Sequence, residues 1–182
     1  MSDFLTILKR EKTVAGDGSM EQRVRTRTNW KWLLICLGIP VIVGGLSAWV
    51  SMDGMKHFEQ VAKPPLTPPG WVFPAAWTIL YLLMGYASYV VWRSDAPKRQ
   101  IDHSLRWYGA QLAANFLWSP LFFRWELYLA ALAWLAVIIV LILVTMARFR
   151  RVDRKAGLLI VPYLCWVLFA GYLNAGVWLL NR

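Results

Sequence analysis

The sequence predicts an all-α, polytopic membrane protein built as a bundle of five transmembrane helices. Hydrophobic residues make up 58% of the 182 residues, charged residues only 16%, and the mean hydropathy is +0.44. Soluble domains carry nearer ~25% charged residues. The apolar residues are also grouped into five runs without Asp, Glu, Lys or Arg. Each run approaches or exceeds the ~20 residues that a helix needs to cross a bilayer, at ~1.5 Å per residue.

Each crossing is expected to be helical, because a strand with open edges would leave its backbone groups unpaired in lipid. We expect one membrane domain, 30–182, after a polar and basic N-terminal tail, 1–29. The expected spans are about 32–50, 71–92, 105–123, 127–147 and 157–180.

Basic residues alternate strongly between the two sides of this topology. Of the 20 Lys and Arg, sixteen fall in the tail and around the second and fourth loops, and four fall in the other loops and at the C-terminus. Because basic loops stay in the cytoplasm, we expect the N-terminus inside and the C-terminus outside. A cytoplasmic membrane is favoured over an outer membrane. The net charge of +10 does not indicate nucleic-acid binding, since the aromatic residues lie inside the spans.

The tail has no apolar core before a cleavage site, so it is not expected to be a signal peptide. We expect a flexible segment that contacts anionic lipid through Arg23, Arg25 and Arg27. Met20 is an alternative start. Cys36 and Cys165 fall inside spans and are expected to pack as small apolar side chains, without forming a disulfide or a metal site.

The first span and the loop after it carry clear backbone signals. Pro40 and the Gly44–Gly45 pair predict a kink, and Gly44 with Ala48 favours close helix contact. Loop 51–70 ends in a proline-rich segment, which lacks N–H groups and should run extended. We expect this loop to cover the outer face of the bundle as a lid, held by a stiff strap that contains Lys63, Pro64, Pro65, Pro68 and Pro69.

Helical spacing gives the second, third and fifth spans an aromatic or polar face each. Pro74 fits the opening turn of the second span, whereas Pro162 is expected to bend the fifth. At ~1.5 Å per residue, the three faces reach similar depths in the outer half of the membrane. They consist of Trp77, Tyr81, Met84 and Ser88; of Gln111, Asn115, Trp118 and Phe122; and of Pro162, Trp166, Ala170 and Leu173.

The fourth span is a run of Ala, Val, Ile and Leu broken only by Trp134, so it is expected to face lipid or a partner. Residues suited to catalysis or metal binding are scarce. His57 and His103 are expected in loops, and Glu126 is expected to be a solvated carboxylate at the mouth of the fourth span. No span centre carries an ionisable group, which disfavours an ion-coupled pump. We expect no catalytic residue, no metal site and no required cofactor.

Interior indole and amide groups need hydrogen-bond partners that lipid does not supply. Such side chains can pack on one another, or they can line a cavity. Their convergence from three helices beneath a long loop favours a ligand pocket. The expected binding residues are Trp77, Tyr81, Gln111, Asn115, Trp118, Phe122, Trp166, Ala170 and Leu173.

Three segments, in order, resemble the translocator protein family, whose members are also called tryptophan-rich sensory proteins or peripheral-type benzodiazepine receptors. They are KPPLTPPGWVFPAAWTILYLLMGYASYVVW, QLAANFLWSPLFF and VPYLCWVLFAGYLN, and the resemblance covers roughly residues 32–181. It implies a five-helix bundle, often a homodimer, that binds porphyrins and other hydrophobic ligands in a pocket closed by the first loop. It implies ligand contacts for Trp77, Tyr81, Gln111, Asn115, Trp118, Trp166 and Ala170.

One departure from the family concerns sterols. Animal relatives have tyrosine directly after the Leu-Asn pair at the end of the fifth span, but here Leu173 and Asn174 are followed by Ala175. We therefore do not expect specific sterol binding.

The expected function is binding of tetrapyrroles (porphyrin or haem intermediates) or similar planar lipophiles, for sensing, transport or disposal. Lys56 or Lys63 would meet the carboxylates of such a ligand. Two alternatives stay open, namely light-dependent porphyrin degradation at the same tryptophans, and a scaffold or regulator without ligand turnover. The expected partners are the lipid bilayer, the porphyrin-like ligand and a second copy of the chain, joined through Gly44–Ala48 or Gly171–Ala175.

Overall fold

The computed structural model describes residues 29–182, and every regular element among them is helical. The expected tail lies outside the described residues, apart from Asn29. The elements in chain order are α2 (Trp30–Val50), α3 (Met52–Phe58), α4 (Val72–Trp92), α5 (Lys98–Ser119), the π-helical turn η1 (Pro120–Arg124), α6 (Tyr128–Val152), α7 (Arg154–Leu159) and α8 (Val161–Leu180).

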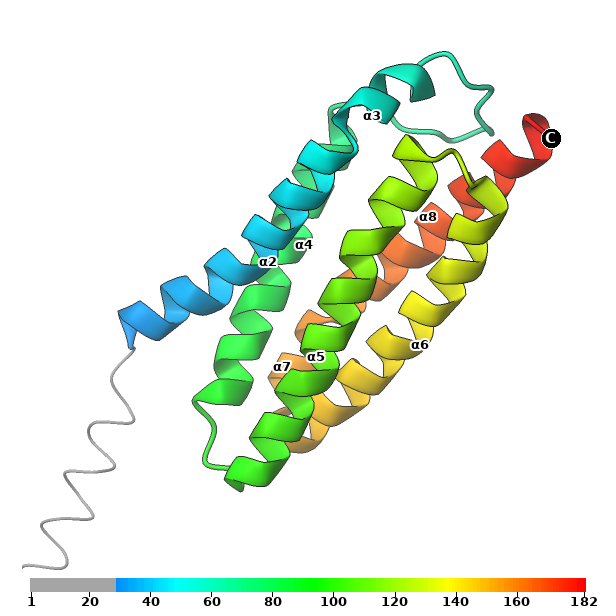
Figure 1. Cartoon of the computed structure of the whole chain (residues 1–182). Helices are drawn as coiled ribbons and strands as arrows, with labels where there is room; N and C mark the ends of the chain where they lie inside the picture. Colours follow the sequence, from blue (N-terminus) through cyan, green and yellow to red (C-terminus); the bar gives the residue numbers. More distant parts are fainter. Residues whose placement is uncertain (1–28) are drawn as a thin grey trace, which may run out of the picture.

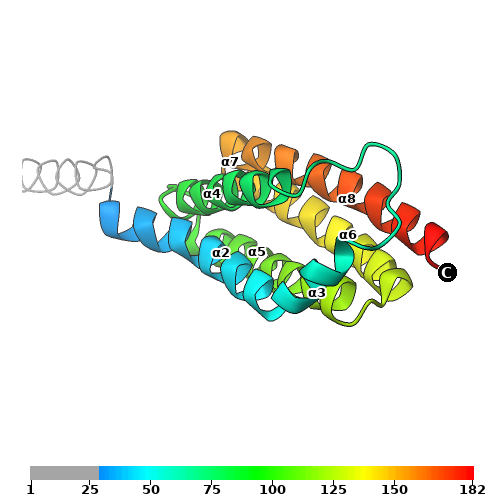
Figure 2. The ribbon, with the colours of Figure 1, turned by 90° about the horizontal axis from the view of Figure 1, so that it is seen from above.

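The long helices α2, α4, α5, α6 and α8 run side by side along one axis (Figure 1). Their packing joins α2 to α4, α5 to α6 and α6 to α8. The view from above shows α4 and α8 on one side of the bundle and α2 and α5 on the other (Figure 2). The core between them is apolar, with fully buried Met84 and Val91 of α4 and Ile138 and Ile142 of α6.

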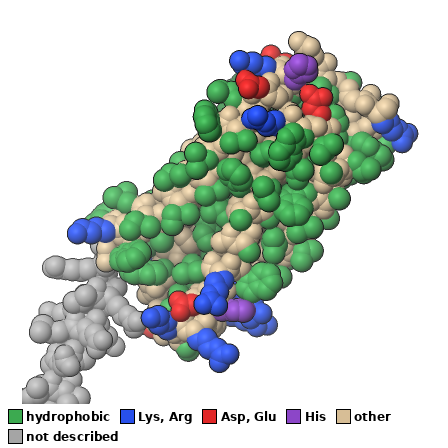
Figure 3. Space-filling model, in the orientation of Figure 1, with side chains coloured by type: hydrophobic (Ala, Val, Ile, Leu, Met, Phe, Trp, Pro, Cys, Tyr) green, Lys and Arg blue, Asp and Glu red, His purple; other side chains and the backbone are tan. Residues whose placement is uncertain are grey.

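Within residues 29–182, four helical segments are long and apolar enough to cross a membrane: Trp30–Val50, Val72–Trp92, Tyr128–Val152 and Arg154–Leu180. Hydrophobic side chains cover the middle of the molecule, and charged side chains lie at its two ends (Figure 3). The helix α5 is equally long, with 22 residues. Its first turns carry Lys98, Arg99, Asp102 and Arg106, which lowers its mean hydropathy. Composition alone therefore does not mark α5 as a span.

The expected fifth span is not one continuous helix. α7 ends at Leu159 and α8 begins at Val161, with Pro162 in the first turn of α8. A proline in a first turn costs no intrahelical hydrogen bond, because those N–H groups have no partner in the helix. The distortion predicted at Pro162 thus takes the form of a break at Ile160, which divides the helical segment Arg154–Leu180 into α7 and α8.

The fourth span was expected to face lipid or a partner, and this holds for only one of its two faces. α6 buries Ala131, Leu135 and Ile138 in the bundle, whereas Val137 and Val140 on the opposite face are exposed. Trp134 is part of the packed side, since its indole Nε1 donates to the Ala114 carbonyl of α5 at 2.8 Å.

α2 and α4 approach so closely that two glycines are required between them. A Cβ on Gly44 would overlap the ring of Tyr81. A Cβ on Gly85 would lie 2.6 Å from the Cys36 carbonyl oxygen and 2.8 Å from the Leu37 Cα. The close contact expected at Gly44 is thus made within the chain, to α4.

The loop between α2 and α4 crosses the end of the bundle (Figure 2). Its first part is the helix α3, which the sequence did not predict, and Phe58 at its end packs edge-on against Phe122 at 5.4 Å and Phe123 at 5.3 Å. The proline-rich part then reaches α8, where the Tyr172 hydroxyl donates to the Pro65 carbonyl at 2.9 Å.

A second contact fixes this loop to the chain beyond α8. Asn181 accepts a hydrogen bond from the Ala62 N–H at 3.2 Å and donates one to the Ala62 carbonyl at 2.9 Å. Of the five strap residues, Pro64 is buried, Pro68 is half-buried, and Lys63, Pro65 and Pro69 are exposed. The strap contacts α8 through Pro64, whose ring lies 2.5 Å from the place that a Cβ on Gly176 would take.

Replacing Gly85 with Ala should separate α2 from α4, because the new methyl group would meet rigid backbone. Overpacking of this kind costs about 1–3 kcal/mol, to be measured as the free energy of unfolding in detergent. Gly45→Ala is the matched control, since nothing lies within 4 Å of a Cβ at Gly45. It should be neutral or up to ~1 kcal/mol stabilising. Equal stability of the two variants would contradict this packing.

Candidate functional site: an aromatic and amide cluster beside an apolar groove

Asn115 joins three helices at the centre of the bundle. Its Nδ2 group donates to the Tyr81 hydroxyl of α4 at 3.0 Å. Its Oδ1 atom accepts from the Tyr163 hydroxyl of α8 at 3.1 Å. Asn115 is 4% exposed and Tyr163 is fully buried. The amide of α5 therefore uses both its donor and its acceptor groups on side chains of the same protein.

Two further predicted residues pack around this hydrogen-bonded centre. The ring of Trp77 stacks on Tyr81, with centroids 5.4 Å apart, and lies 6.2 Å from Tyr163. Gln111 is fully buried one turn from Asn115, and its Nε2 atom lies 3.8 Å from the Met84 sulfur. Trp77, Tyr81, Gln111 and Asn115 thus form one cluster with Tyr163, which we call the central cluster.

Trp118 and Phe122 belong to a second group, nearer the end of the bundle that carries α3. Their rings stack at 5.2 Å. Three further rings pack edge-on against Phe122, with centroids 4.9 to 5.4 Å away. They belong to Phe58 of α3, Phe123 of η1 and Tyr128 of α6. Aromatic contact therefore joins the loop that covers the bundle to the end of α5.

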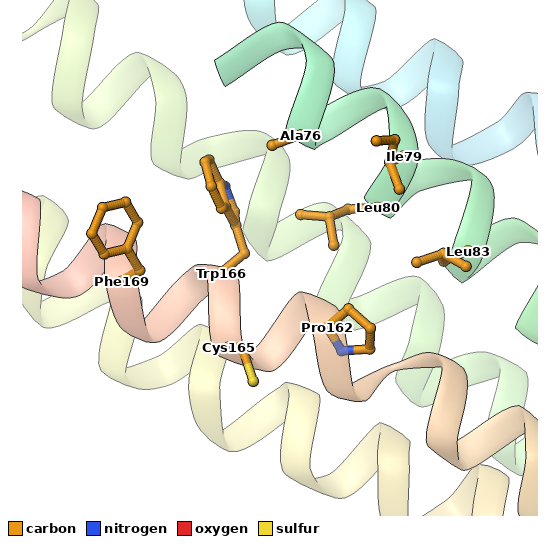
Figure 4. A pocket seen from close by; sticks show the side chains of 8 residues that line it. All are labelled: Ala76, Ile79, Leu80, Leu83, Pro162, Cys165, Trp166 and Phe169. Atoms are coloured by element: carbon orange, nitrogen blue, oxygen red, sulfur yellow. The ribbon is translucent and has the colours of Figure 1, made fainter. Parts of the chain in front are cut away.

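An apolar groove lies at the seam between α4 and α8, with a volume of about 440 Å³. Figure 4 shows Trp166 extending from α8 toward Ala76 of α4. The indole Nε1 atom of Trp166 is buried and has no hydrogen-bond partner. Phe73 and Phe169 lie beside the indole, with centroids at 6.2 and 5.8 Å. The groove is lined by Ala76, Ile79, Leu80, Leu83, Pro162, Cys165, Trp166 and Phe169.

The nine expected site residues are thus divided among different parts of the bundle. Trp166 lines the groove, Ala170 follows it one turn later on α8, and Leu173 is buried. The central cluster lies inside, between α4, α5 and α8. Its aromatic rings and amides contact one another.

Tyr163 is the main residue that the sequence interpretation missed. The buried positions of α8 are Tyr163, Val167, Leu173, Asn174 and Val177. The face that we expected began one residue earlier, at Pro162. The sequence did contain a signal for Tyr163, since it places a phenol inside an apolar span. A buried hydroxyl needs a hydrogen-bond partner, so this side chain should point into the bundle.

The polar residues considered for other roles lie outside both the groove and the central cluster. His57 lies in α3 and His103 in α5, so the prediction that they are loop residues was wrong. The Lys63 amine donates to the Glu59 carbonyl at 2.9 Å and lies over the ring of Phe58. Glu126 is exposed, as expected. Within residues 29–182, no three His, Cys, Asp or Glu side chains are grouped as metal ligands.

Comparison with known proteins agrees with these features. The model of the TspO/MBR family matches residues 36–179. The chain is 37% identical over 150 residues to the tryptophan-rich protein TspO of Chlorobaculum tepidum, which covers 82% of this chain and 95% of that protein.

Two further relatives carry other names. The tryptophan-rich sensory protein of Cereibacter sphaeroides is 37% identical over 148 residues, covering 81% of this chain and 88% of the relative. The translocator protein of Homo sapiens is 34% identical over 135 residues, covering 72% and 79%. With its membrane-spanning helices and these matches, the chain belongs to the TspO/MBR family of multi-pass integral membrane proteins.

Proposed function

We propose that this protein binds planar lipophilic ligands of the tetrapyrrole class, such as porphyrin or haem intermediates, in the groove between α4 and α8, for sensing, transport or disposal. The observation that carries the proposal is the Trp166 indole. Its N–H group is buried without a partner at the edge of an apolar hollow. An unsatisfied donor in such a place is costly, and a ligand acceptor would remove the cost.

The shape and chemistry of the groove suit a flat apolar molecule. Its volume of about 440 Å³ lies within the ~300–1,000 Å³ of typical ligand sites. Trp166 and Phe169 offer aromatic rings for stacking, while Leu80 and Leu83 supply an aliphatic wall. The groove opens at the side of the bundle, so a ligand dissolved in the bilayer could enter it directly.

The central cluster has a supporting role in this proposal. Trp77, Tyr81, Asn115 and Tyr163 hold α4, α5 and α8 in register behind the groove. The names of the relatives, a sensory protein and a translocator, fit a protein that binds a ligand and reports or moves it. Neither name identifies the ligand.

We propose that α5 is a fifth crossing helix and that the N-terminus is cytoplasmic. α5 buries Leu112, Ala114 and Asn115 and packs along α6, as a crossing helix would. Ten of the Lys and Arg within residues 29–182 fall around the loops after α4 and α6 or at the start of α2. Lys56, Lys63, Arg124 and Arg182 belong to the opposite side, which supports a cytoplasmic location for the more basic end.

We also propose a homodimer. Of the two candidate contact pairs, Gly44 is already closed by Tyr81, whereas nothing lies within 4 Å of a Cβ at Gly171. The pair Gly171–Ala175 on α8 therefore remains available for close contact with a second copy.

Trp166→Ala should weaken protoporphyrin binding at least tenfold, because stacking and the indole donor are both lost. Trp166→Phe keeps a ring and loses the N–H group, which costs about 1 kcal/mol or roughly fivefold. Binding is measured by the Soret absorbance of protoporphyrin titrated into the purified protein, so that changes in tryptophan emission do not matter.

Trp125→Ala is the control, since Trp125 is 55% exposed at the end of η1 and does not line the groove. It should bind protoporphyrin like the wild type. Wild-type affinity in Trp166→Ala would refute the groove as the binding site. The pigment should be recovered unchanged after illumination, whereas protein-dependent loss would favour the degradation alternative.

Reporter fusions test the proposed topology. Alkaline phosphatase fused after Arg182 should be active outside the cytoplasm, and green fluorescent protein at the same point should be dark. Fusions after Pro97, which follow α2 and α4 only, should give the reverse pattern. A fluorescent fusion after Arg182 would mean an even number of crossings or the opposite orientation.

A further inference from the structure

A second hollow, at the other end of the bundle from the lid, is lined by cationic side chains. It has a volume of about 440 Å³ and lies between the start of α5 and the end of α6. Lys and Arg side chains gather at this end in Figure 3. The lining residues include three arginines and a histidine, and no carboxylate: Pro97, Arg99, Gln100, His103, Ser104, Arg148 and Arg151.

Hydrogen bonds between and within the two helices shape this basic pocket. Gln100 Nε2 donates to the Arg151 carbonyl at 3.1 Å, which joins the first turn of α5 to the last turn of α6. Trp107 Nε1 donates to His103 Nε2 at 3.1 Å. Because Nε2 accepts this bond, the neutral imidazole of His103 carries its proton on Nδ1. The Nδ1–H group is then a hydrogen-bond donor in addition to the arginines.

Three guanidinium groups around one hollow repel one another, and an anion between them would offset that repulsion. Guanidinium groups match the oxygens of a phosphate through paired hydrogen bonds. α5 also begins here, after Pro97 and without a side-chain cap, so the positive end of its dipole faces the same region. Asp102 on α5 is exposed and does not line the pocket.

An apolar surface continues directly from the pocket along α6. Val140 and Leu143 are 58% and 43% exposed, and Ala147 and Arg151 follow at helical spacing on the same face. A molecule with a phosphate at Arg151 could thus extend an apolar chain over Leu143 and Val140. A free phosphate ion would make no use of this surface.

We propose that the basic pocket binds the phosphate of an anionic phospholipid headgroup, whose acyl chain lies along the exposed face of α6. Basic pockets between membrane helices on the cytoplasmic side are suited to such headgroups. This site is separate from the α4–α8 groove, and none of its lining residues belongs to that groove.

The test uses the purified full chain, stripped of lipid in neutral detergent, with lipid binding followed by native mass spectrometry. The probes are palmitoyl-oleoyl phosphatidylglycerol, the corresponding phosphatidylcholine and inorganic phosphate. The wild type should bind phosphatidylglycerol at least tenfold more tightly than phosphatidylcholine. Arg148→Gln with Arg151→Gln should remove most of this difference.

Lys98→Gln with Arg106→Gln is the matched control, because it removes the same charge from the same end of the bundle without touching the pocket. It should change the affinity for phosphatidylglycerol less than twofold. If both double variants lost the same affinity for phosphatidylglycerol, binding would depend on the total charge at this end of the bundle and not on the pocket. This result would overturn the proposal. Equal binding of the two lipids by the wild type would also overturn it.

Millimolar inorganic phosphate should not displace phosphatidylglycerol. Displacement would show that the pocket binds a free anion, and would refute the proposal that it binds a lipid headgroup. The folding of each variant is checked by its thermal unfolding in detergent. Protoporphyrin titration gives an independent readout, which Arg148→Gln with Arg151→Gln should leave unchanged.

Discussion

The hydrogen bonds of Asn115 to Tyr81 and Tyr163 are the constraint on which the arrangement of this bundle depends. In a bilayer the apolar faces of helices gain little by leaving lipid for one another, so packing and interhelical hydrogen bonds decide which faces meet. One amide here engages a phenol on each of two other helices. These two bonds constrain the rotation of α4, α5 and α8 about their own axes, and the ring of Trp77 and the thioether of Met84 pack beside them.

The same constraint explains where the bundle has space for a ligand. Asn115, Tyr81 and Tyr163 bond to one another at the centre, and the groove lies between α4 and α8, outside the central cluster. Trp134 obeys the same rule, since its indole reaches a backbone carbonyl of α5. Trp166 has no such partner and lies at the edge of the hollow.

Much of the fold could be predicted because charge-free runs and helical spacing are local properties. The spans containing α2, α4 and α6 and the burial of Gln111, Asn115 and Trp118 followed from them. Other features depend on contacts between distant residues. A sequence pattern does not show that Tyr163 pairs with Asn115, or that α3 docks on the bundle through Phe58, because both depend on distant neighbours. Depth and facing also do not tell whether facing side chains bond to one another, so the nine expected binding residues stay a prediction.

The two hydrogen bonds between Ala62 and Asn181 join positions 119 residues apart. During synthesis the proline-rich segment leaves the ribosome long before its anchor does, so it has nothing to hold until the fifth long helix has been inserted. The lid consequently gains its last two hydrogen bonds only when the end of the chain has been made. A chain that ended before Asn181 would keep the contacts of Phe58 with Phe122 and of Pro65 with Tyr172, but would lose the two bonds that hold Ala62.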